Sequence, residues 1–158
     1  MRSAIVITAS NRAAAGVYQD LSGQTLKDGL TKLGYQVVDL KLVQDDINQI
    51  SSAIKGALAE KIDLIVTTGG TGISPTDVTP EATKQFLQKE LPGFQEAMRA
   101  YSREKVPTAD LSRGLAGTNG TSLIVNLPGS QGAVKDGLVI LERLAPHIHD
   151  QLAGHDHS

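Results

Sequence analysis

The stretch DLIVTTGGTGISPTDVTPEAT, from Asp63 to Thr83, contains in order a strand, a glycine-rich turn, a lone carboxylate and the start of a helix. Residues 64–66 are a short apolar run with β-branched character, which is typical of a central strand in a parallel sheet. Thr79 and Pro80 are predicted to be the N-cap and the first residue of the following helix. Elements in this order favour an α/β sheet with a binding site beside the turn.

Three glycines within four residues, Gly69, Gly70 and Gly72, form the predicted turn. Glycine tolerates positive φ and lets backbone N–H groups approach a ligand, so a turn at the carboxyl end of a strand is suited to phosphates. The alternative is that these glycines only make a tight turn. Asp77 follows, where its charge would repel a polyphosphate unless a divalent cation bridged the two. Its alternative is an Asx-turn residue that shapes the loop.

Length and composition limit the classes of function. A chain of 158 residues suits one domain, and we expect this domain over residues 1–152, followed by a polar, disordered tail over 153–158. The net charge is −2 with scattered basic residues, so neither nucleic acid nor a membrane is an expected partner. Cysteine is absent, which excludes disulfides and cysteine nucleophiles. The first apolar run is too short for a signal peptide or a membrane span, so we expect a cytoplasmic protein.

Strands alternate with helices along the chain. Apolar periodicity predicts further strands over residues 3–8, 35–42 and 122–127, and helices over 22–33, 47–58, 80–89, 94–105 and 133–144. Asp46 is the predicted N-cap of the second helix, Pro92 and Gly93 are predicted to end the third, and residues 118–121 to form a turn. This alternation predicts a three-layer α/β/α domain with a mostly parallel sheet.

The segments that follow the strands should meet at one edge of the sheet, because the carboxyl ends of parallel strands point the same way. They contain Ser10, Asn11, Asp45, Asp46, Thr68, Gly69, Gly70, Thr71, Gly72, Pro128, Gly129 and Ser130. Glycine amides, hydroxyls and carboxylates gathered in this way are typical of a nucleotide and metal site. The glycine turn lacks the Lys-Ser/Thr pair of a Walker P-loop, and the sequence has no GxSxG elbow or Cys/His pair for covalent catalysis.

The stretch at 63–83 closely resembles the signature of the molybdopterin adenylyltransferases of molybdenum-cofactor biosynthesis, which carry TTGGTG followed by DVTPEAT. The resemblance runs through most of the chain. Its other landmarks are SNRAAAGVYQDLSG (10–23), QDD (44–46), LPGF (91–94) and NLPGS (126–130). It implies a fold of the molybdopterin-binding-domain type.

The resemblance implies transfer of AMP from Mg-ATP to the terminal phosphate of molybdopterin, with release of pyrophosphate. It implies that Asp45 and Asp77 are catalytic and hold or orient Mg²⁺, although Asp45 read alone also suits a helix N-cap or turn. The implied nucleotide and substrate contacts are Ser10, Asn11, Thr68, Gly69, Gly70, Thr71, Gly72, Asn126, Pro128, Gly129 and Ser130. Further substrate contacts that it implies are Asp20, Ser22, Gly23, Ser112 and Arg113.

A phosphate nucleophile is already ionised at neutral pH, so this reaction needs alignment and charge neutralisation rather than a strong base. One alternative is a non-catalytic molybdopterin-binding or scaffold module of the same fold. Another is the related molybdate-insertion or nucleotide-hydrolase branch, which usually has extra domains. The family also implies a homotrimer and handover of the product to a molybdate-insertion enzyme.

The chain departs from the common family pattern at three positions. Asn11 stands where Asp is frequent, Gln44 where Pro is frequent, and Thr76 where Arg often precedes the signature aspartate. The last difference removes a positive charge near the expected phosphates. The four histidines, at 147, 149, 155 and 157, lie near the C-terminus, where we expect no functional metal site because two of them fall in the polar tail.

Overall fold

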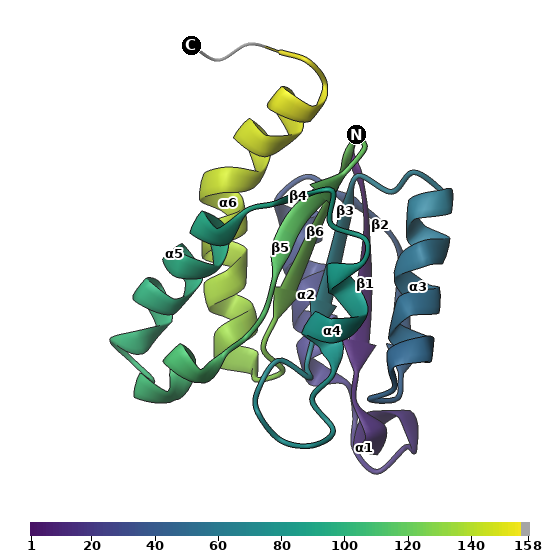
Figure 1. Ribbon diagram of the computed structural model, residues 1–158, viewed down its shortest axis with the longest axis vertical. Helices are drawn as coiled ribbons and strands as arrows, with labels where there is room; N and C mark the ends of the chain where they lie inside the picture. Colours follow the sequence, from purple (N-terminus) through teal and green to yellow (C-terminus); the bar gives the residue numbers. More distant parts are fainter. Residues whose placement is uncertain (156–158) are drawn as a thin grey trace.

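A six-stranded mixed sheet runs through the middle of the molecule, and the computed structural model describes the chain over residues 1–155 (Figure 1). The strands are β1 (Ser3–Ala9), β2 (Gln36–Val43), β3 (Leu64–Thr68), β4 (Lys89–Glu90), β5 (Ala116–Asn119) and β6 (Ser122–Leu127). They lie in the order β2-β1-β3-β6-β5-β4. The first four in this order pair in parallel, and β5 and β4 pair antiparallel at one edge. The prediction of a mostly parallel sheet is therefore confirmed.

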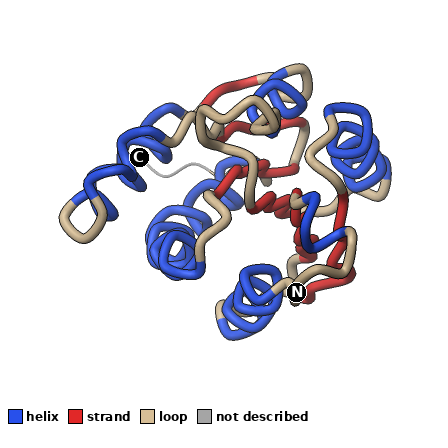
Figure 2. The backbone as a smooth tube through the Cα atoms, turned by 90° about the horizontal axis from the view of Figure 1, so that it is seen from below, coloured by secondary structure: helices blue, strands red, loops and turns tan. Residues whose placement is uncertain are grey.

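Helices cover both faces of the sheet. They are α1 (Asn11–Ala14), α2 (Leu21–Lys32), α3 (Ile47–Ala59), α4 (Thr79–Lys84), α5 (Pro92–Arg103) and α6 (Gln131–Leu152), with a 3₁₀ turn η1 (Pro107–Leu111). Buried residues of α3 and α4 share one core with the sheet, and those of α2, α5 and α6 share the other. Figure 2 shows the strands between these two sets of helices. The three-layer prediction is confirmed.

The central strands supply both cores because successive side chains point to opposite faces. In β1, Ala4 and Val6 pack in the core with α2, α5 and α6, whereas Ile5 and Ile7 pack in the core with α3. All four are at most 2% exposed. Full burial of a side chain such as Ile7 contributes about 1.5–3 kcal/mol. The continuous apolar runs in the sequence reflect this two-sided burial, which holds the strand ends rigidly in place.

Two aspartates begin helices near the end of the sheet that carries the predicted site. The Asp46 side chain accepts a hydrogen bond from Gln49 N at 2.9 Å, which confirms the predicted N-cap of α3. Asp20 caps α2 in the same way, because Oδ1 accepts from Gly23 N at 2.9 Å. Such caps contribute about 1 kcal/mol each and fix where the helices start.

The structure corrects the third predicted helix at both ends. Thr79 is the first helical residue rather than the N-cap, and its hydroxyl donates to Gly69 O at 2.9 Å. The helix ends at Lys84 instead of continuing to residue 89, because Lys89 and Glu90 pair with β5 as the short strand β4. Pro92 begins α5 rather than ending the preceding helix, which agrees with the preference of proline for the first helical turn.

Two further elements differ from the prediction. Residues 118 and 119 belong to β5, which forms a hairpin with β6, so only Gly120 and Thr121 lie between the strands. The last helix continues past residue 144 to Leu152 through Pro146, because Ala145 is buried in the core and the buried His149 forms a hydrogen bond with Tyr35 at 2.7 Å. The prediction of a disordered tail from 153 stays a prediction, since residues 156–158 lie outside the described residues. Within residues 1–155, no helix is long and apolar enough to cross a membrane.

Candidate active site

The segments that follow β1, β2, β3 and β6 meet at one end of the sheet, the lower end in Figure 1. Ser10 N donates to Val43 O at 2.9 Å, which joins the ends of β1 and β2. Gly69 N donates to Leu127 O at 3.0 Å, which joins the ends of β3 and β6. The sheet therefore brings together residues from four separate parts of the sequence.

Packing alone requires the first two glycines of the turn. Gly69 and Gly70 have φ of 95° and 69°, a region that favours glycine. A Cβ on Gly69 would lie 2.4 Å from Ala9 O, and one on Gly70 would lie 2.3 Å from Thr79 Oγ1. The tight-turn alternative thus explains why these residues are glycine, and a role in anion binding has to rest on the backbone amides.

The amides of the turn are available to an anion. Within residues 1–155, the N–H groups of Gly70, Thr71 and Gly72 donate to no protein acceptor. The first turn of α6 lies beside them, where Ser130 is the N-cap and accepts from Ala133 N at 3.1 Å. Successive free amides next to the positive end of a long helix form a site suited to phosphate.

Asp45 is held by Asn11 and does not cap α3. Asp45 Oδ2 accepts from Asn11 N at 3.0 Å, and Asp45 N donates to Asn11 Oδ1 at 2.8 Å. Since Asp46 is the cap of α3, the capping alternative for Asp45 does not apply. Asn11 offers the same acceptor oxygen that an aspartate would, without a second charge beside Asp45. Its side chain supports Asp45 and borders neither of the site's two cavities, and its ligand contact stays a prediction.

Asp77 has the loop role foreseen as its alternative and still keeps a free oxygen. Oδ2 accepts from Ser74 N at 3.0 Å and from Ser74 Oγ at 2.8 Å, which ties the carboxylate back to an earlier residue of its own loop rather than forming an Asx turn. Oδ1 has no hydrogen-bond partner among the described residues, and the same is true of Oδ1 of Asp45. Each carboxylate therefore keeps one oxygen for another ligand.

These two carboxylates suit Mg²⁺. Asp45 and Asp77 border the same cavity, and Mg²⁺ is commonly held by one or two carboxylates together with substrate phosphates and water. Residues 1–155 contain no group of three or more His, Cys, Asp or Glu side chains that could hold a metal. The donor set thus fits a cation that arrives with a polyphosphate better than a permanent protein-only metal site.

Two cavities meet at the glycine turn. Their volumes are about 500 and 460 Å³, and both are lined by Gly69, Gly70, Asp77 and Gly129. The second cavity lies beside Asp45 and the end of β1, and its other lining residues include Ser10, Tyr18, Asp20, Ser22 and Thr68. The turn therefore separates two chambers, each of a size suited to part of a large ligand.

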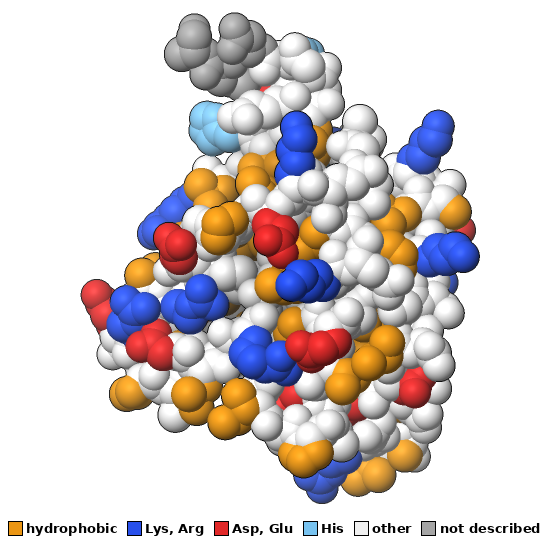
Figure 3. All heavy atoms as spheres, viewed as in Figure 1, with side chains coloured by type: hydrophobic (Ala, Val, Ile, Leu, Met, Phe, Trp, Pro, Cys, Tyr) orange, Lys and Arg blue, Asp and Glu red, His pale blue; other side chains and the backbone are white. Residues whose placement is uncertain are grey.

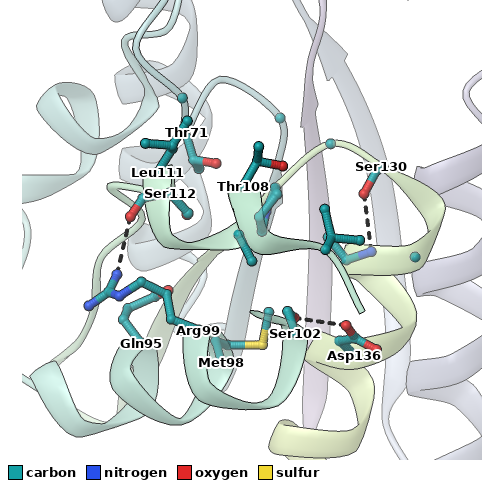
Figure 4. Close-up of a pocket in the computed structure, with 18 of the residues that line it drawn as sticks. Thr71, Gln95, Met98, Arg99, Ser102, Thr108, Leu111, Ser112, Ser130 and Asp136 are labelled. Atoms are coloured by element: carbon teal, nitrogen blue, oxygen red, sulfur yellow. Dashed lines mark hydrogen bonds between the residues drawn. The ribbon is translucent and has the colours of Figure 1, made fainter. Parts of the chain in front are cut away.

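The first cavity was not foreseen as a whole from the sequence. It lies between α5, η1 and the start of α6, and Figure 4 labels ten of its lining residues: Thr71, Gln95, Met98, Arg99, Ser102, Thr108, Leu111, Ser112, Ser130 and Asp136. Thr71, Ser112 and Ser130 were predicted, but the residues of α5 were not. The available signal was a polar residue, Gln95, on the apolar face of a helix that also presents Phe94 and Met98.

Gln95 is oriented by the backbone. It is 4% exposed, and its Nε2 donates to Leu115 O and Asn126 O at 3.0 Å each. These two bonds fix the orientation of the side-chain amide. Its Oε1 accepts no hydrogen bond from the described residues. At the other end of the cavity, Ser102 Oγ and Lys105 Nζ donate to the Asp136 carboxylate at 2.7 and 2.8 Å. The hydrogen bond to Asp136 raises the pKa of Lys105.

Several predicted residues hold loops of the site in place. Thr68 Oγ1 donates to Pro128 O at 2.9 Å, and Ser22 Oγ donates to Gly129 O at 2.7 Å. These bonds fix the loop 128–130 against the glycine turn. Ser10 is the N-cap of α1, and its hydroxyl lies 3.0 Å from Tyr18 Oη.

Asn126 was predicted to contact the nucleotide or substrate, and the structure places it in the core, where it is fully buried. Its Nδ2 donates to Thr67 Oγ1 at 2.8 Å and to Thr83 Oγ1 at 3.0 Å, and its Oδ1 accepts from Leu115 N at 3.0 Å. A side chain with all its polar groups engaged in the core has no surface for a ligand. Asn126 is therefore a structural residue that ties β6 to β3 and α4.

Gly23 and Arg113, both predicted as substrate contacts, have structural roles in the protein. A Cβ on Gly23 would lie 2.2 Å from Asp20 Oδ2, so glycine is required here for Asp20 to cap α2. Arg113 forms an ion pair with Glu81 at 2.6 Å and also donates to backbone carbonyls of the glycine loop. The hydrogen bond with Arg113 lowers the pKa of Glu81 and raises the pKa of Arg113. Both residues support the site through other groups.

The surface shown in Figure 3 carries intermingled acidic and basic side chains, with apolar side chains along its lower end. Exposed apolar residues of the loops and helix ends near the site are Val17, Tyr18, Leu21, Ile73, Val106 and Leu111. The site is therefore polar inside, through its carboxylates and backbone amides, and partly apolar around its opening.

Comparison with known proteins agrees with this geometry. The family described as "Probable molybdopterin binding domain" matches residues 5–148. A molybdopterin adenylyltransferase of Helicobacter pylori strain J99 is 43% identical over 152 residues, which cover 94% of this chain and 86% of the relative. The chain also resembles a solved structure of MogA at 44% identity and a TM-score of 0.92, covering 96% of this chain and 99% of the other. The Mog protein of Mycobacterium ulcerans gives 46% identity and a TM-score of 0.91 with the same coverage.

The match to the family, over residues 5–148, covers nearly all of the sheet and every segment that borders the two cavities. On the match to the family, the sequence identity and the shared fold, this chain belongs to the molybdopterin-binding domain family of molybdenum-cofactor biosynthesis.

Proposed function

We propose that this protein is a molybdopterin adenylyltransferase, which transfers AMP from ATP to the terminal phosphate of molybdopterin and releases pyrophosphate. The observation that carries the proposal is the pair of cavities separated by free backbone amides and bordered by two carboxylates. A reaction that joins two large organic phosphates needs two chambers with a shared phosphate site between them. The names of close relatives support the same activity.

In this mechanism an oxygen of the molybdopterin phosphate attacks the α-phosphorus of ATP. The new P–O bond forms as the bond from the α-phosphorus to the α–β bridging oxygen breaks, and pyrophosphate leaves with that electron pair. The free amides of Gly70, Thr71 and Gly72 would bind phosphate oxygens near the junction of the cavities. No side chain has to remove a proton, because the attacking phosphate is already ionised at neutral pH.

Asp45 and Asp77 would hold Mg²⁺ through their free Oδ1 atoms. When bound, the ion would neutralise the polyphosphate and stabilise the charge on the departing pyrophosphate. Asn11 fixes Asp45 and Ser74 fixes Asp77, so both carboxylates are oriented before the ligand arrives. Orientation in advance reduces the entropy that must be lost on reaching the transition state.

The expectations of a homotrimer and of handover to a molybdate-insertion enzyme rest on the family resemblance. The alternative function is a module that binds molybdopterin without catalysis. Free Oδ1 atoms on both carboxylates favour the enzyme, because a binding module has no need of two oriented carboxylates beside a phosphate site.

The test is to incubate the protein with molybdopterin, ATP and Mg²⁺ and to look for adenylylated molybdopterin by mass spectrometry. Asp45→Asn should abolish the product. Asp46→Asn is the matched control, since asparagine caps a helix as well as aspartate does and the neighbouring carboxylate has no place in the mechanism. Tight molybdopterin binding without any product in the wild-type protein would contradict the proposal and support the binding module.

A further inference from the structure

Arg113 joins the two ends of the loop that carries Asp77. Its Nε donates to Gly72 O at 2.8 Å and its Nη2 donates to Asp77 O at 3.0 Å, so one guanidinium bridges the two ends of the loop 72–77. Its backbone N donates to Thr71 O at 2.8 Å. Residues 73–76 between these points are exposed. The separation of the two ends of the loop therefore depends on a side chain from a distant part of the sequence.

The distance between the two ends of this loop also sets the position of the Asp77 carboxylate. A Cβ on Gly72 would lie 2.8 Å from Asp77 Oδ2, so the carboxylate sits directly over this glycine. Oδ2 is held by Ser74 within the same loop, and only Oδ1 is left for a cation. A change in the distance between Gly72 and Asp77 would move this oxygen relative to the free amide of Gly72.

Glu81 in turn orients Arg113. Its two carboxylate oxygens accept from Nη1 at 2.6 Å and from Nη2 at 3.3 Å. Four hydrogen bonds thus engage a guanidinium that has five N–H groups, which leaves at most one for a substrate. Glu81 borders neither of the two cavities of the site, so its effect on a ligand must pass through Arg113.

We propose that Arg113, oriented by Glu81, is a positioning residue that sets the Asp77 carboxylate for the metal–nucleotide complex and does not itself bind substrate. The proposal rests on the proposed function. Its physical reason is that the planar guanidinium bridges two carbonyls and a carboxylate at once, whereas the single ammonium of lysine cannot reproduce this geometry. Loss of the bridge frees the loop without removing any group that contacts the ligand.

The experiment compares Arg113→Lys and Glu81→Gln with the wild-type protein. The matched control is Arg2→Lys, since Arg2 forms a similarly exposed ion pair with Asp150 at 3.0 Å at the opposite end of the sheet. Binding of Mn²⁺ is measured by electron paramagnetic resonance in the presence of α,β-methylene-ATP, which cannot transfer AMP. Molybdopterin binding and the thermal midpoint are measured on the same samples.

We expect Arg113→Lys to weaken Mn²⁺ binding about tenfold, since loss of a group that orients a metal ligand typically costs about 10–100-fold in metal affinity. Glu81→Gln should give a smaller weakening in the same direction, and Arg2→Lys none. Molybdopterin affinity should stay within about twofold, and kcat should fall more than KM for molybdopterin rises. Folded Arg113→Lys and Glu81→Gln proteins with unchanged Mn²⁺ affinity would overturn the proposal.

Two other outcomes would also contradict it. A raised KM for ATP in Arg113→Lys, with Glu81→Gln unaffected, would make Arg113 a direct phosphate contact. Loss of metal binding only in proportion to a lowered thermal midpoint would make its role one of general stability. The Mn²⁺ measurement needs no turnover. A wild-type protein that fails to adenylylate molybdopterin would therefore reject the proposed function, while the Mn²⁺ affinities of Arg113→Lys and the wild-type protein could still be compared.

Discussion

Substitution of Gly70 by alanine should reveal a specific contact between the glycine turn and the first residue of α4. Gly70 has a φ of 69°, and its new Cβ would lie 2.3 Å from Thr79 Oγ1. The positive φ costs about 1–2 kcal/mol for an L-residue, and the overlap with a buried side chain costs about 1–3 kcal/mol more. We therefore expect Gly70→Ala to lower the free energy of unfolding by about 2–5 kcal/mol.

The partner substitution separates these two costs. Thr79→Ala removes the overlapping hydroxyl and leaves Gly69 O without its hydrogen bond, which should cost about 1–3 kcal/mol by itself. In the Thr79→Ala background, Gly70→Ala should cost mainly the φ term. The double variant should therefore be more stable than the sum of the two single effects predicts, by about 1–3 kcal/mol.

Urea denaturation of the four proteins at one fixed protein concentration measures this coupling. Gly16→Ala is the matched control, because Gly16 has a φ of 76° and a Cβ added there would meet no atom within 4 Å, so it should show the φ term alone. It should also be additive with Thr79→Ala. Effects of Gly70→Ala and Thr79→Ala that add to within about 0.5 kcal/mol would refute the reasoning, since that is the additivity of independent sites.

The remaining predictions concern charge, pH and assembly. Asp77→Asn should lower the adenylyl-transfer rate roughly a hundredfold or more while molybdopterin binding persists, because it removes a charge that would hold the cation; near-normal turnover at saturating Mg²⁺ would contradict this. Burial lowers the pKa of His149 from 6.5, so on acidification the unfolded state takes up this proton before the folded state does. The thermal midpoint should therefore fall as the pH drops below about 6.5. Burial raises the pKa of Tyr35 from 10.0 to about 12, so on raising the pH the unfolded state loses this proton before the folded state does. The thermal midpoint should therefore also fall above about pH 10. Tyr35→Phe should remove this effect. Static light scattering should give the mass of a trimer, and a monomer across micromolar concentrations would contradict the assembly expected from the family.

The sheet and its site-bearing turn could be predicted because their signals are local. A continuous apolar run such as residues 64–66 has few alternatives to a two-sided buried strand, and Asp46 before a periodic apolar stretch is a strong start signal for α3. The edge hairpin could not be predicted in the same way. β4 has two residues and β5 reads AGTN, so neither carries a pattern of its own, and both are strands only because they pair with a neighbour.

The sequence by itself determined the class of fold and the glycine turn, because strand and helix periods and turn residues act over a few neighbouring positions. The family resemblance added the two carboxylates as candidates. Only the tertiary structure decided what each polar side chain does. Asn126 is engaged in the core, Gln95 is aimed into a cavity, and Arg113 holds the loop of Asp77 from 36 positions away along the chain. The physical reason is that each polar group forms its bonds with whichever donors and acceptors the packed sheet brings within about 3 Å, and those partners come from distant segments.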